Sequence, residues 1–273
     1  MRTESNRKPQ APPRTAHATM AAPGTHFPFT LHVAPDYEAM SQAASGCIAA
    51  EIQRQPDALI CLASGASPAR TYELLAERGR TEPQLFNRIR VITLDEWVGL
   101  TVDDPASCAT YVREKLVKPL QIGPDRFFAW KSQPADPQAE CRHVADWLAA
   151  NGPISLCILG LGTNGHLGFN EPADELQAGP HLAELSEASL THAMLGQTGR
   201  EARFGLTLGM TDILCSRKVI LLVSGPRKAE QMRRLFTQRI STHFPASLLW
   251  LHPALMIFSD RPAASLLRAE LPP

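Results

Sequence analysis

Short, uninterrupted apolar runs alternate along this chain with longer segments in which apolar residues recur every three or four positions. Each run has the length of a strand and lacks the alternation of a half-exposed sheet, which predicts strands buried on both faces of a parallel sheet. These runs lie at 58–63, 89–94, 154–160, 219–223 and 255–258. Shorter strands are expected at 27–33, 126–129 and 205–208.

Helical periodicity is clearest over 37–54, where Met40, Ala44, Ile48 and Ile52 fall on one face behind Asp36 as the N-cap. Pro68 is placed as the first-turn proline of a helix over 68–79. Further helices are expected over 106–118, 141–150, 210–214, 224–237 and 245–251. Strands that alternate with helices predict an α/β fold with a doubly wound, largely parallel sheet and helices on both faces.

The domain organisation follows from composition. Residues 1–26 consist mainly of Arg, Pro, Ala, Thr and Ser, which predicts a disordered N-terminal extension. Residues 27–273 contain no interdomain linker and are expected to form a single α/β domain. Residues 174–203 lack clear periodicity, which indicates a functional loop, a lid or small elements.

Composition narrows the functional classes. Lys and Arg total 27, as do Asp and Glu, so the net charge is zero and nothing points to nucleic acid. The six cysteines form no C-x-x-C pair and no Cys/His cluster with zinc spacing. Cys61 and Cys157 lie in apolar runs, which predicts buried thiols and fits a reducing cytoplasm. No apolar stretch approaches the roughly 18 residues that span a bilayer, so no membrane association is expected.

Candidate chemistry lies where the predicted strands end. Ser64-Gly65-Ala66-Ser67 leads from a strand into a helix, and the free N–H groups at a helix N-terminus bind phosphate. The alternative is an ordinary capped helix. Lys228 follows another strand and could supply a cation to the same phosphate, or could simply be a solvated side chain.

Two further strand ends carry titratable groups. Asp95 and Glu96 end an apolar strand. One of the two carboxylates could act as a base, or Asp95 could form a turn while Glu96 is solvated. His166 and Glu171 lie in a glycine-rich loop after the strand at 154–160. They could act as an acid/base pair, or His166 could simply be packed in a turn. Because the carboxyl ends of parallel strands share one edge of a sheet, these loops can converge.

Four motifs in the same order resemble the glucosamine-6-phosphate deaminase/isomerase family. They are LASGASPARTY at 62–72, LDEWVGL at 94–100, LGLGTNGHLGFNEPA at 159–173 and the LTLG…ILLVSGPRK region at 206–228. The resemblance covers about residues 57–258 and is nearest to the galactosamine-6-phosphate deaminase/isomerase branch. The 6-phosphogluconolactonase branch shares the glycine-rich loop but lacks the NEP that follows it here.

The resemblance implies a Rossmann-like core, no metal or other cofactor, a phosphosugar substrate and a homo-oligomer. It implies an aldose–ketose isomerisation coupled to loss of ammonia. By this resemblance Asp95 matches the carboxylate that moves a proton from C2 to C1, His166 the ring-opening acid/base, and Glu171 its partner. Ser64, Gly65, Ala66 and Ser67 match the phosphate loop, and Lys228 the phosphate-binding lysine.

Two departures from the glucosamine enzymes stand out. Asn164 replaces the Asp that precedes their Gly-His, and a neutral amide does not favour a protonated His166 as a carboxylate would. Asn164 is therefore expected to modulate the pH dependence. Residues 174–199 contain no Arg or Lys, so the family's phosphate-binding arginine lacks a counterpart there. The candidate replacements are His181, His192, Arg200 and Arg203.

The leading hypothesis is therefore an amino-sugar-6-phosphate deaminase/isomerase that converts galactosamine 6-phosphate and water to tagatose 6-phosphate and ammonia. The enzymatic alternatives are a glucosamine-6-phosphate deaminase and a 6-phosphogluconolactonase in which His166 activates water. A third hypothesis is a non-catalytic sugar-phosphate sensor, which would need a disabled base. Asp95, His166 and Glu171 are all present.

Overall fold

The computed structural model of the chain describes residues 29–101, 103–191, 193–196 and 202–267. Within these ranges, seven strands pair in parallel throughout and form the larger of two sheets. In their order across the sheet they are β1 (Thr30–Ala34), β10 (Leu255–Asp260), β9 (Val219–Val223), β6 (Leu156–Gly160), β2 (Leu59–Leu62), β3 (Arg90–Thr93) and β5 (Phe127–Phe128). The predicted parallel α/β sheet is confirmed.

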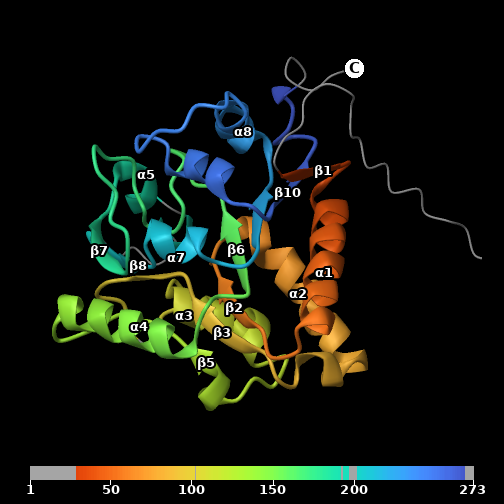
Figure 1. Ribbon diagram of the computed structural model, residues 1–273, viewed down its shortest axis with the longest axis vertical. Helices are drawn as coiled ribbons and strands as arrows, with labels where there is room; N and C mark the ends of the chain where they lie inside the picture. Colours follow the sequence, from red (N-terminus) through yellow and green to blue (C-terminus); the bar gives the residue numbers. More distant parts are fainter. Residues whose placement is uncertain (1–28, 102, 192, 197–201, 268–273) are drawn as a thin grey trace, which may run out of the picture.

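Helices cover both faces of this sheet (Figure 1). One face packs against α1 (Tyr37–Arg54), α2 (Ala66–Thr81), α3 (Cys108–Val112) and the π-helical turns at 113–117 that continue α3. The other face packs against α4 (Pro137–Asn151), α7 (Met210–Leu214), α8 (Ala229–Leu235) and a 3₁₀ helix at 245–251. The central strands β2, β6 and β9 are apolar on both sides because each face of the sheet is covered there.

The alternation along β2 shows how one strand serves both cores. Ile60 and Leu62 belong to the cluster that contains α1 and α2, whereas Leu59 and Cys61 belong to the cluster that contains α4. All four side chains are at most 2% exposed. At about 1.5–3 kcal/mol for each fully buried large apolar side chain, such strands are a major source of stability.

The helix starts follow local signals. Asp36 caps α1, as predicted, by accepting a 2.8 Å hydrogen bond from the Ala39 N–H. The start of α2 was predicted two residues late, because the helix begins at Ala66 and Pro68 is its third residue. Gly65 precedes it with φ +125°, a conformation that side-chain-bearing residues rarely adopt. Short 3₁₀ helices lie at 83–86, 124–126 and 226–228.

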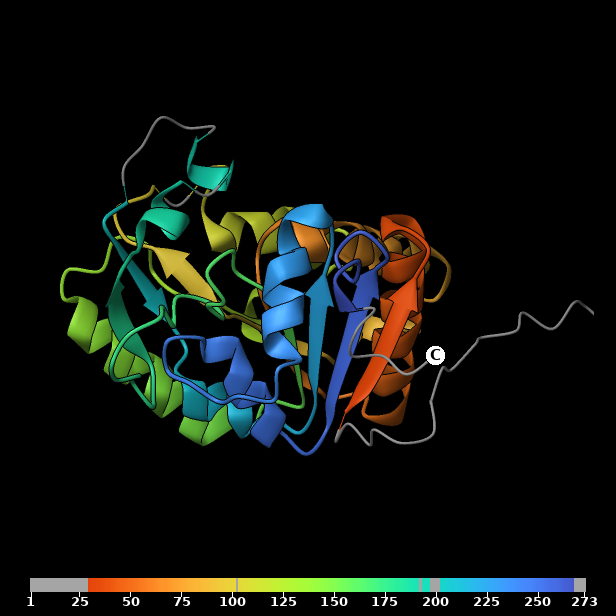
Figure 2. The same cartoon turned by 90° about the horizontal axis from the view of Figure 1, so that it is seen from above.

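A second, antiparallel sheet lies to the side of the large one that is away from α1 (Figures 1 and 2). Its order is β4 (Asp95–Trp97), β8 (Phe204–Thr207) and β7 (His181–Glu184). Leu94 joins the two sheets, since its N–H bonds to Leu62 of β2 and its carbonyl accepts from the Leu208 N–H. The strand at 205–208 was predicted, but β4 and β7 were not.

The segment 174–203 therefore contains small elements, one of the three options that its sequence left open. Besides β7 it holds α5 (Glu187–Leu190) and α6 (Ala193–Gly196). The predicted N-terminal extension at 1–26 lies outside the described residues, as do His192 and Arg200. In the part of the chain that is described, no helix is long and apolar enough to cross a membrane.

The strand order determines which loops meet. The chain passes from β2 to β3 on one side of β2 and later returns as β6 on its other side. This reversal is a topological switch point, where ligands bind in open α/β sheets. The loops after β2, β3 and β6 therefore share the carboxyl edge of the sheet at its centre, and the loop after β9 follows next to β6.

Candidate active site

The loop after β2 is anchored through its carbonyl groups. The Tyr111 hydroxyl donates to the Gly65 carbonyl, and the Tyr37 hydroxyl donates to the Ala66 carbonyl, both at 2.6 Å. No side chain caps the N-terminus of α2. The first N–H groups of the helix therefore point away from these anchors with no intrahelical acceptor, which is the arrangement that binds an anion.

Two serines tie this loop to the loop after β9. The hydroxyls of Ser67 and Ser224 lie 3.1 Å apart, and the Gly225 N–H donates to both carboxylate oxygens of Asp260. Lys228 lies three residues after Gly225 and makes no ion pair with a carboxylate in the described ranges. Burial and the neighbouring Arg227 lower the pKa of Lys228 to about 8.

Asp95 is held at the point where β3 passes into β4. Its residue exposure is 7%, and its Oδ1 atom has no hydrogen-bond partner in the described part of the chain. Burial raises the pKa of Asp95 to about 7, the Cys108 thiol acts in the opposite direction, and the carboxyl of Glu96 adds to the rise. A carboxylate with a pKa near neutrality can both accept and return a proton at physiological pH.

Glu96, the next residue, has a different task. Alternation along β4 turns it to the other side, where it is fully buried and accepts hydrogen bonds from Ser107 Oγ at 2.7 Å and from the N–H groups of Cys108 and Ala109. It therefore holds the first turn of α3. The interpretation of Glu96 as a solvated residue is wrong, because its donors are internal.

His166 and Glu171 form a partly buried pair in the loop after β6. The imidazole Nδ1 lies 3.3 Å from Glu171 Oε2, and the two side chains are 15% and 10% exposed. Glu171 also accepts from Asn164 Nδ2 at 2.8 Å and Ser186 Oγ at 3.0 Å, as well as from Ser189 Oγ. Burial would raise the pKa of Glu171, but the hydrogen bond and charge of His166, with Ser189 and Asn164, lower it to about 2.

These contacts fix which imidazole nitrogen exchanges protons. Ser189 Oγ donates to Glu171 and lies 3.2 Å from His166 Nδ1, so its oxygen can only accept from that nitrogen. The ionised Glu171 also requires a donor at Nδ1. We therefore assign the hydrogen to Nδ1, which leaves Nε2 as the nitrogen that gains and loses a proton.

Gly162 provides the surface on which the His166 ring lies. A Cβ atom built at Gly162 would come within 2.2 Å of the ring Cδ2 and 2.4 Å of Nε2. The Gly162 N–H also donates to the His166 carbonyl at 3.0 Å. The glycine-rich loop thus curls around its histidine, and no side chain fits at 162 while the ring stays in place.

The residues that sequence reasoning missed are mostly hydrogen-bond partners of those it found. Ser186 and Ser189 come from the weakly patterned segment after 174. The one signal there is Ser186 followed by Glu187, which is typical of a helix start. Ser224 and Cys108 contact the loop after β2, at Ser67 and Ser64. None of these pairings has a sequence spacing that identifies it.

Of the four candidate replacements for an anion-binding arginine, only His181 and Arg203 lie in the described residues, and both are engaged elsewhere. His181 Nδ1 lies 2.9 Å from the Gly179 carbonyl, and burial lowers the pKa of this histidine. Arg203 pairs with Glu184 on an exposed surface. Among the described residues, no group of three or more His, Cys, Asp or Glu side chains is arranged to hold a metal ion.

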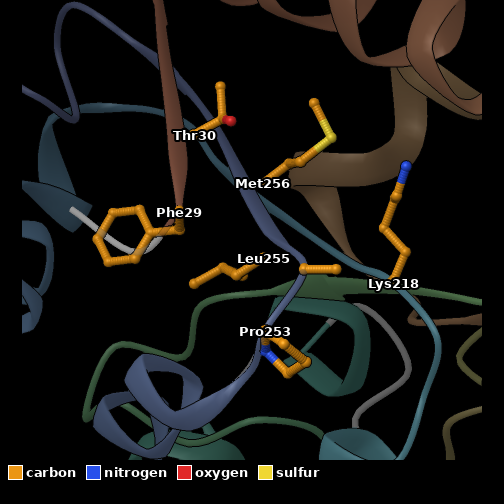
Figure 3. A pocket seen from close by; sticks show the side chains of 7 residues that line it. Phe29, Thr30, Lys218, Pro253, Leu255 and Met256 are labelled. Carbon is orange, nitrogen blue, oxygen red and sulfur yellow. The ribbon is translucent and has the colours of Figure 1, made fainter. Parts of the chain in front are cut away.

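A hollow of about 370 Å³ lies at the opposite edge of the sheet (Figure 3). It is bordered by the amino-terminal ends of β1 and β10 and by Lys218, which precedes β9. Lys218 is paired with Glu51 of α1 and so offers no free charge to an anion. The candidate chemistry is at the carboxyl edge, and this hollow is separate from it.

The fold is an α/β fold whose carboxyl-edge loops bring together an uncapped helix N-terminus, the buried Asp95 and the His166–Glu171 pair. Comparison with known proteins gives the family. The family model of glucosamine-6-phosphate isomerases/6-phosphogluconolactonase matches residues 36–256. The chain belongs to this family and is an enzyme of its sugar-phosphate isomerase/deaminase group.

Individual relatives agree. The chain is 40% identical over 223 residues to AgaI of Escherichia coli (strain K12), whose own assignment as a deaminase is provisional; the match covers 82% of this chain and 88% of that protein. It is 36% identical to glucosamine-6-phosphate deaminase 1 of Bacillus subtilis (strain 168), over 84% of this chain and 96% of that one.

Solved structures agree on the fold. A glucosamine-6-phosphate deaminase described as monomeric superposes with a TM-score of 0.81 at 35% identity, covering 86% of this chain and 99% of its own. The 6-phosphogluconolactonase of Trypanosoma brucei superposes with a TM-score of 0.75 at 20% identity, covering 89% and 100%. This second likeness reports the fold alone.

Proposed function

We propose that the chain is a galactosamine-6-phosphate deaminase/isomerase, which converts its substrate and water to tagatose 6-phosphate and ammonia. The observation that carries the reaction is the buried Asp95 carboxyl with an unpartnered Oδ1 and a pKa near 7, on the opposite side of β2 from the His166–Glu171 pair. The galacto preference rests on the motif resemblance and on the 40% identity to AgaI.

The loop after β2 and Lys228 would hold the 6-phosphate. The N–H groups at the start of α2 supply neutral donors and a positive dipole end, and Lys228 supplies charge. With a pKa of about 8, Lys228 is mostly protonated at pH 7, and a bound phosphate would raise that pKa further. Contacts remote from the reacting carbons position the sugar over the centre of the edge.

His166 would open the pyranose ring. Nε2 delivers a proton to the ring oxygen and removes the proton of the anomeric hydroxyl, which yields the open-chain aldehyde. Glu171 remains ionised throughout because of its low pKa, so it stabilises the imidazolium without taking the proton itself.

Asp95 would then carry out the isomerisation. Its carboxylate removes the proton from C2 and returns it to C1, while the C2 ammonium gives one proton to O1 and becomes an iminium. Water adds to C2, ammonia leaves, and the 2-ketose remains. Each positioned acid or base of this kind contributes about 10²–10⁴-fold to the rate.

The test is ammonia release from galactosamine 6-phosphate and glucosamine 6-phosphate, measured with the full chain, beside consumption of 6-phosphogluconolactone. We expect ammonia from both amino sugars with the larger kcat/KM for the galacto epimer. A larger value for the gluco epimer would correct only the substrate preference. Absence of ammonia from both would overturn the proposal, and lactone consumption would then identify the hydrolase.

The family resemblance also supports a cytoplasmic homo-oligomer. The solved relative at 35% identity is described as a monomer, so the proposed oligomer would distinguish this chain from that relative. Light scattering of the purified chain at micromolar concentration tests it. A mass near 29.8 kDa would show a monomer and overturn the proposed oligomer.

A further inference from the structure

Cys108 lies between the two halves of the candidate site. It is the first residue of α3 and is 1% exposed. The Ser64 hydroxyl, from the loop after β2, donates to the Cys108 sulfur at 3.1 Å. On its other side the thiol lies beside the Asp95 carboxyl and lowers the pKa of that carboxyl, against the effect of burial.

The backbone of Cys108 is held in place by hydrogen bonds to the Glu96 carboxylate. Glu96 Oε1 accepts from the Cys108 N–H at 3.0 Å, and Glu96 Oε2 accepts from Ser107 Oγ and the Ala109 N–H. Glu96 follows Asp95 directly on β4. The same strand therefore carries the carboxyl that the thiol contacts and the carboxyl that holds the start of its helix.

The hydrogens have one consistent arrangement. Burial raises the pKa of the Cys108 thiol, which keeps its proton. Since Ser64 donates to the sulfur, the single S–H hydrogen is available for Asp95. The result is a directed chain from the Ser64 hydroxyl through the thiol to the carboxyl.

Among the titratable groups of the described residues that interact with Asp95, no cation competes with the thiol. The titratable groups that interact with this carboxyl are Glu96 on β4, Cys108 on α3, Cys61 on β2 and Tyr72 on α2. None of these four is a cation, and Tyr72 already donates to the Ala63 carbonyl at 2.8 Å. Cys108 is therefore the donor among them that favours the ionised form of Asp95.

We propose that Cys108 is a positioning residue for the reaction, and that its thiol orients the Asp95 carboxyl while it holds the phosphate loop at Ser64. The inference rests on the proposed role of Asp95 as the base. The thiol acts through Asp95 and makes no contact with substrate. Its removal changes the ionisation of the base in addition to any change in packing.

The experiment compares the pH dependence of ammonia release for the wild-type chain, Cys108→Ala and Cys108→Ser. In Cys108→Ala the carboxylate loses its donor, so the acid limb of the kcat profile should move upward by on the order of half a pH unit, with kcat at pH 7 reduced about 3–10-fold. A hydroxyl is a stronger donor than a thiol, so Cys108→Ser should return the acid limb to the wild-type position or below it.

Cys141→Ala is the matched control, because Cys141 is a buried thiol of α4 in a different apolar cluster from Cys108. It should lose stability on thermal unfolding, as Cys108→Ala does, without moving the acid limb. An acid limb that coincides in wild type and Cys108→Ala, in two folded proteins, would overturn the proposal. A wild-type chain that releases no ammonia would instead overturn the proposed function.

Discussion

The end of β3 and the loop after β6 each present a carboxylate to the same sheet edge, in opposite environments. Asp95 is buried with an unpartnered oxygen, and its pKa rises to about 7. Glu171 is nearly as buried but receives donors from an imidazole, an amide and two hydroxyls, and its pKa falls to about 2. Burial is common to both, so the supply of donors separates a proton carrier from a permanent anion.

Replacement of the proton carrier has the largest expected effect. Asp95→Asn removes the group proposed to move the proton between C2 and C1, and we expect kcat to fall by about 10³-fold. Steady-state ammonia release measures it. A variant that retains more than a tenth of the wild-type kcat would remove Asp95 from the role of base.

Replacement of the permanent anion should have a smaller effect. Glu171→Gln keeps an acceptor for Ser189 and Asn164 but removes the charge that stabilises a protonated His166, and we expect kcat to fall about 10²-fold. Ser189→Ala leaves the charge in place, so its kcat should fall by less than the kcat of Glu171→Gln. A kcat that falls further in Ser189→Ala than in Glu171→Gln would contradict the role of the Glu171 charge.

The two replacements should change stability in opposite directions at pH 8. The raised pKa of Asp95 means that its ionised form opposes folding, a cost absent below about pH 4 and complete above pH 7. The lowered pKa of Glu171 stabilises the fold above about pH 4.5, and this is lost as the pH falls toward 2.

Asp95→Asn should therefore raise, and Glu171→Gln lower, the free energy of unfolding at pH 8 by roughly 1–3 kcal/mol. Urea denaturation measures both. The difference for Asp95→Asn should shrink when the measurement is repeated at pH 4. Stability changes of the same sign in the two variants at pH 8 would contradict the contrast between the two carboxylates.

The smallest effect is expected at Asn164. Its side-chain NH2 group donates to Glu171 Oε2, and its side-chain oxygen accepts from the backbone N–H of His166 at 3.1 Å. Asn164→Asp would turn the donor into a second anion beside His166, which favours the protonated imidazole. The limb of the pH–rate profile governed by His166 should move to the alkaline side by about half to one unit. An unshifted profile would show that Asn164 does not modulate this pair.

Most of the large sheet could be predicted because its strands are continuous apolar runs, and burial on both faces is the only environment that suits them. In the small sheet only β8 could be predicted, and β4 and β7 could not. β4 is three residues long and follows β3 with only Leu94 between them, so the sequence contains no turn to separate the two strands. β7 lies in a segment whose pattern is set by contacts with β8 rather than by one continuous core.

The candidate site was predictable in part for the same reason. Asp95, His166 and Lys228 follow strands that could be recognised, and parallel strands bring their ends together. The different tasks of Asp95 and Glu96 depend on which side of β4 each one faces, and that depends on a pairing with β8 from more than 100 residues later in the chain. Ser189 and Cys108 matter through single hydrogen bonds that leave no periodic signal.

The contact between Gly162 and the His166 ring has a consequence for how this sequence can vary. Any other residue at 162 would drive its first side-chain carbon into the imidazole while leaving the parallel sheet untouched. A library randomised at this codon and sorted for folded protein should thus recover many residues, whereas the same library sorted for turnover should return glycine alone. The position separates selection for folding from selection for catalysis.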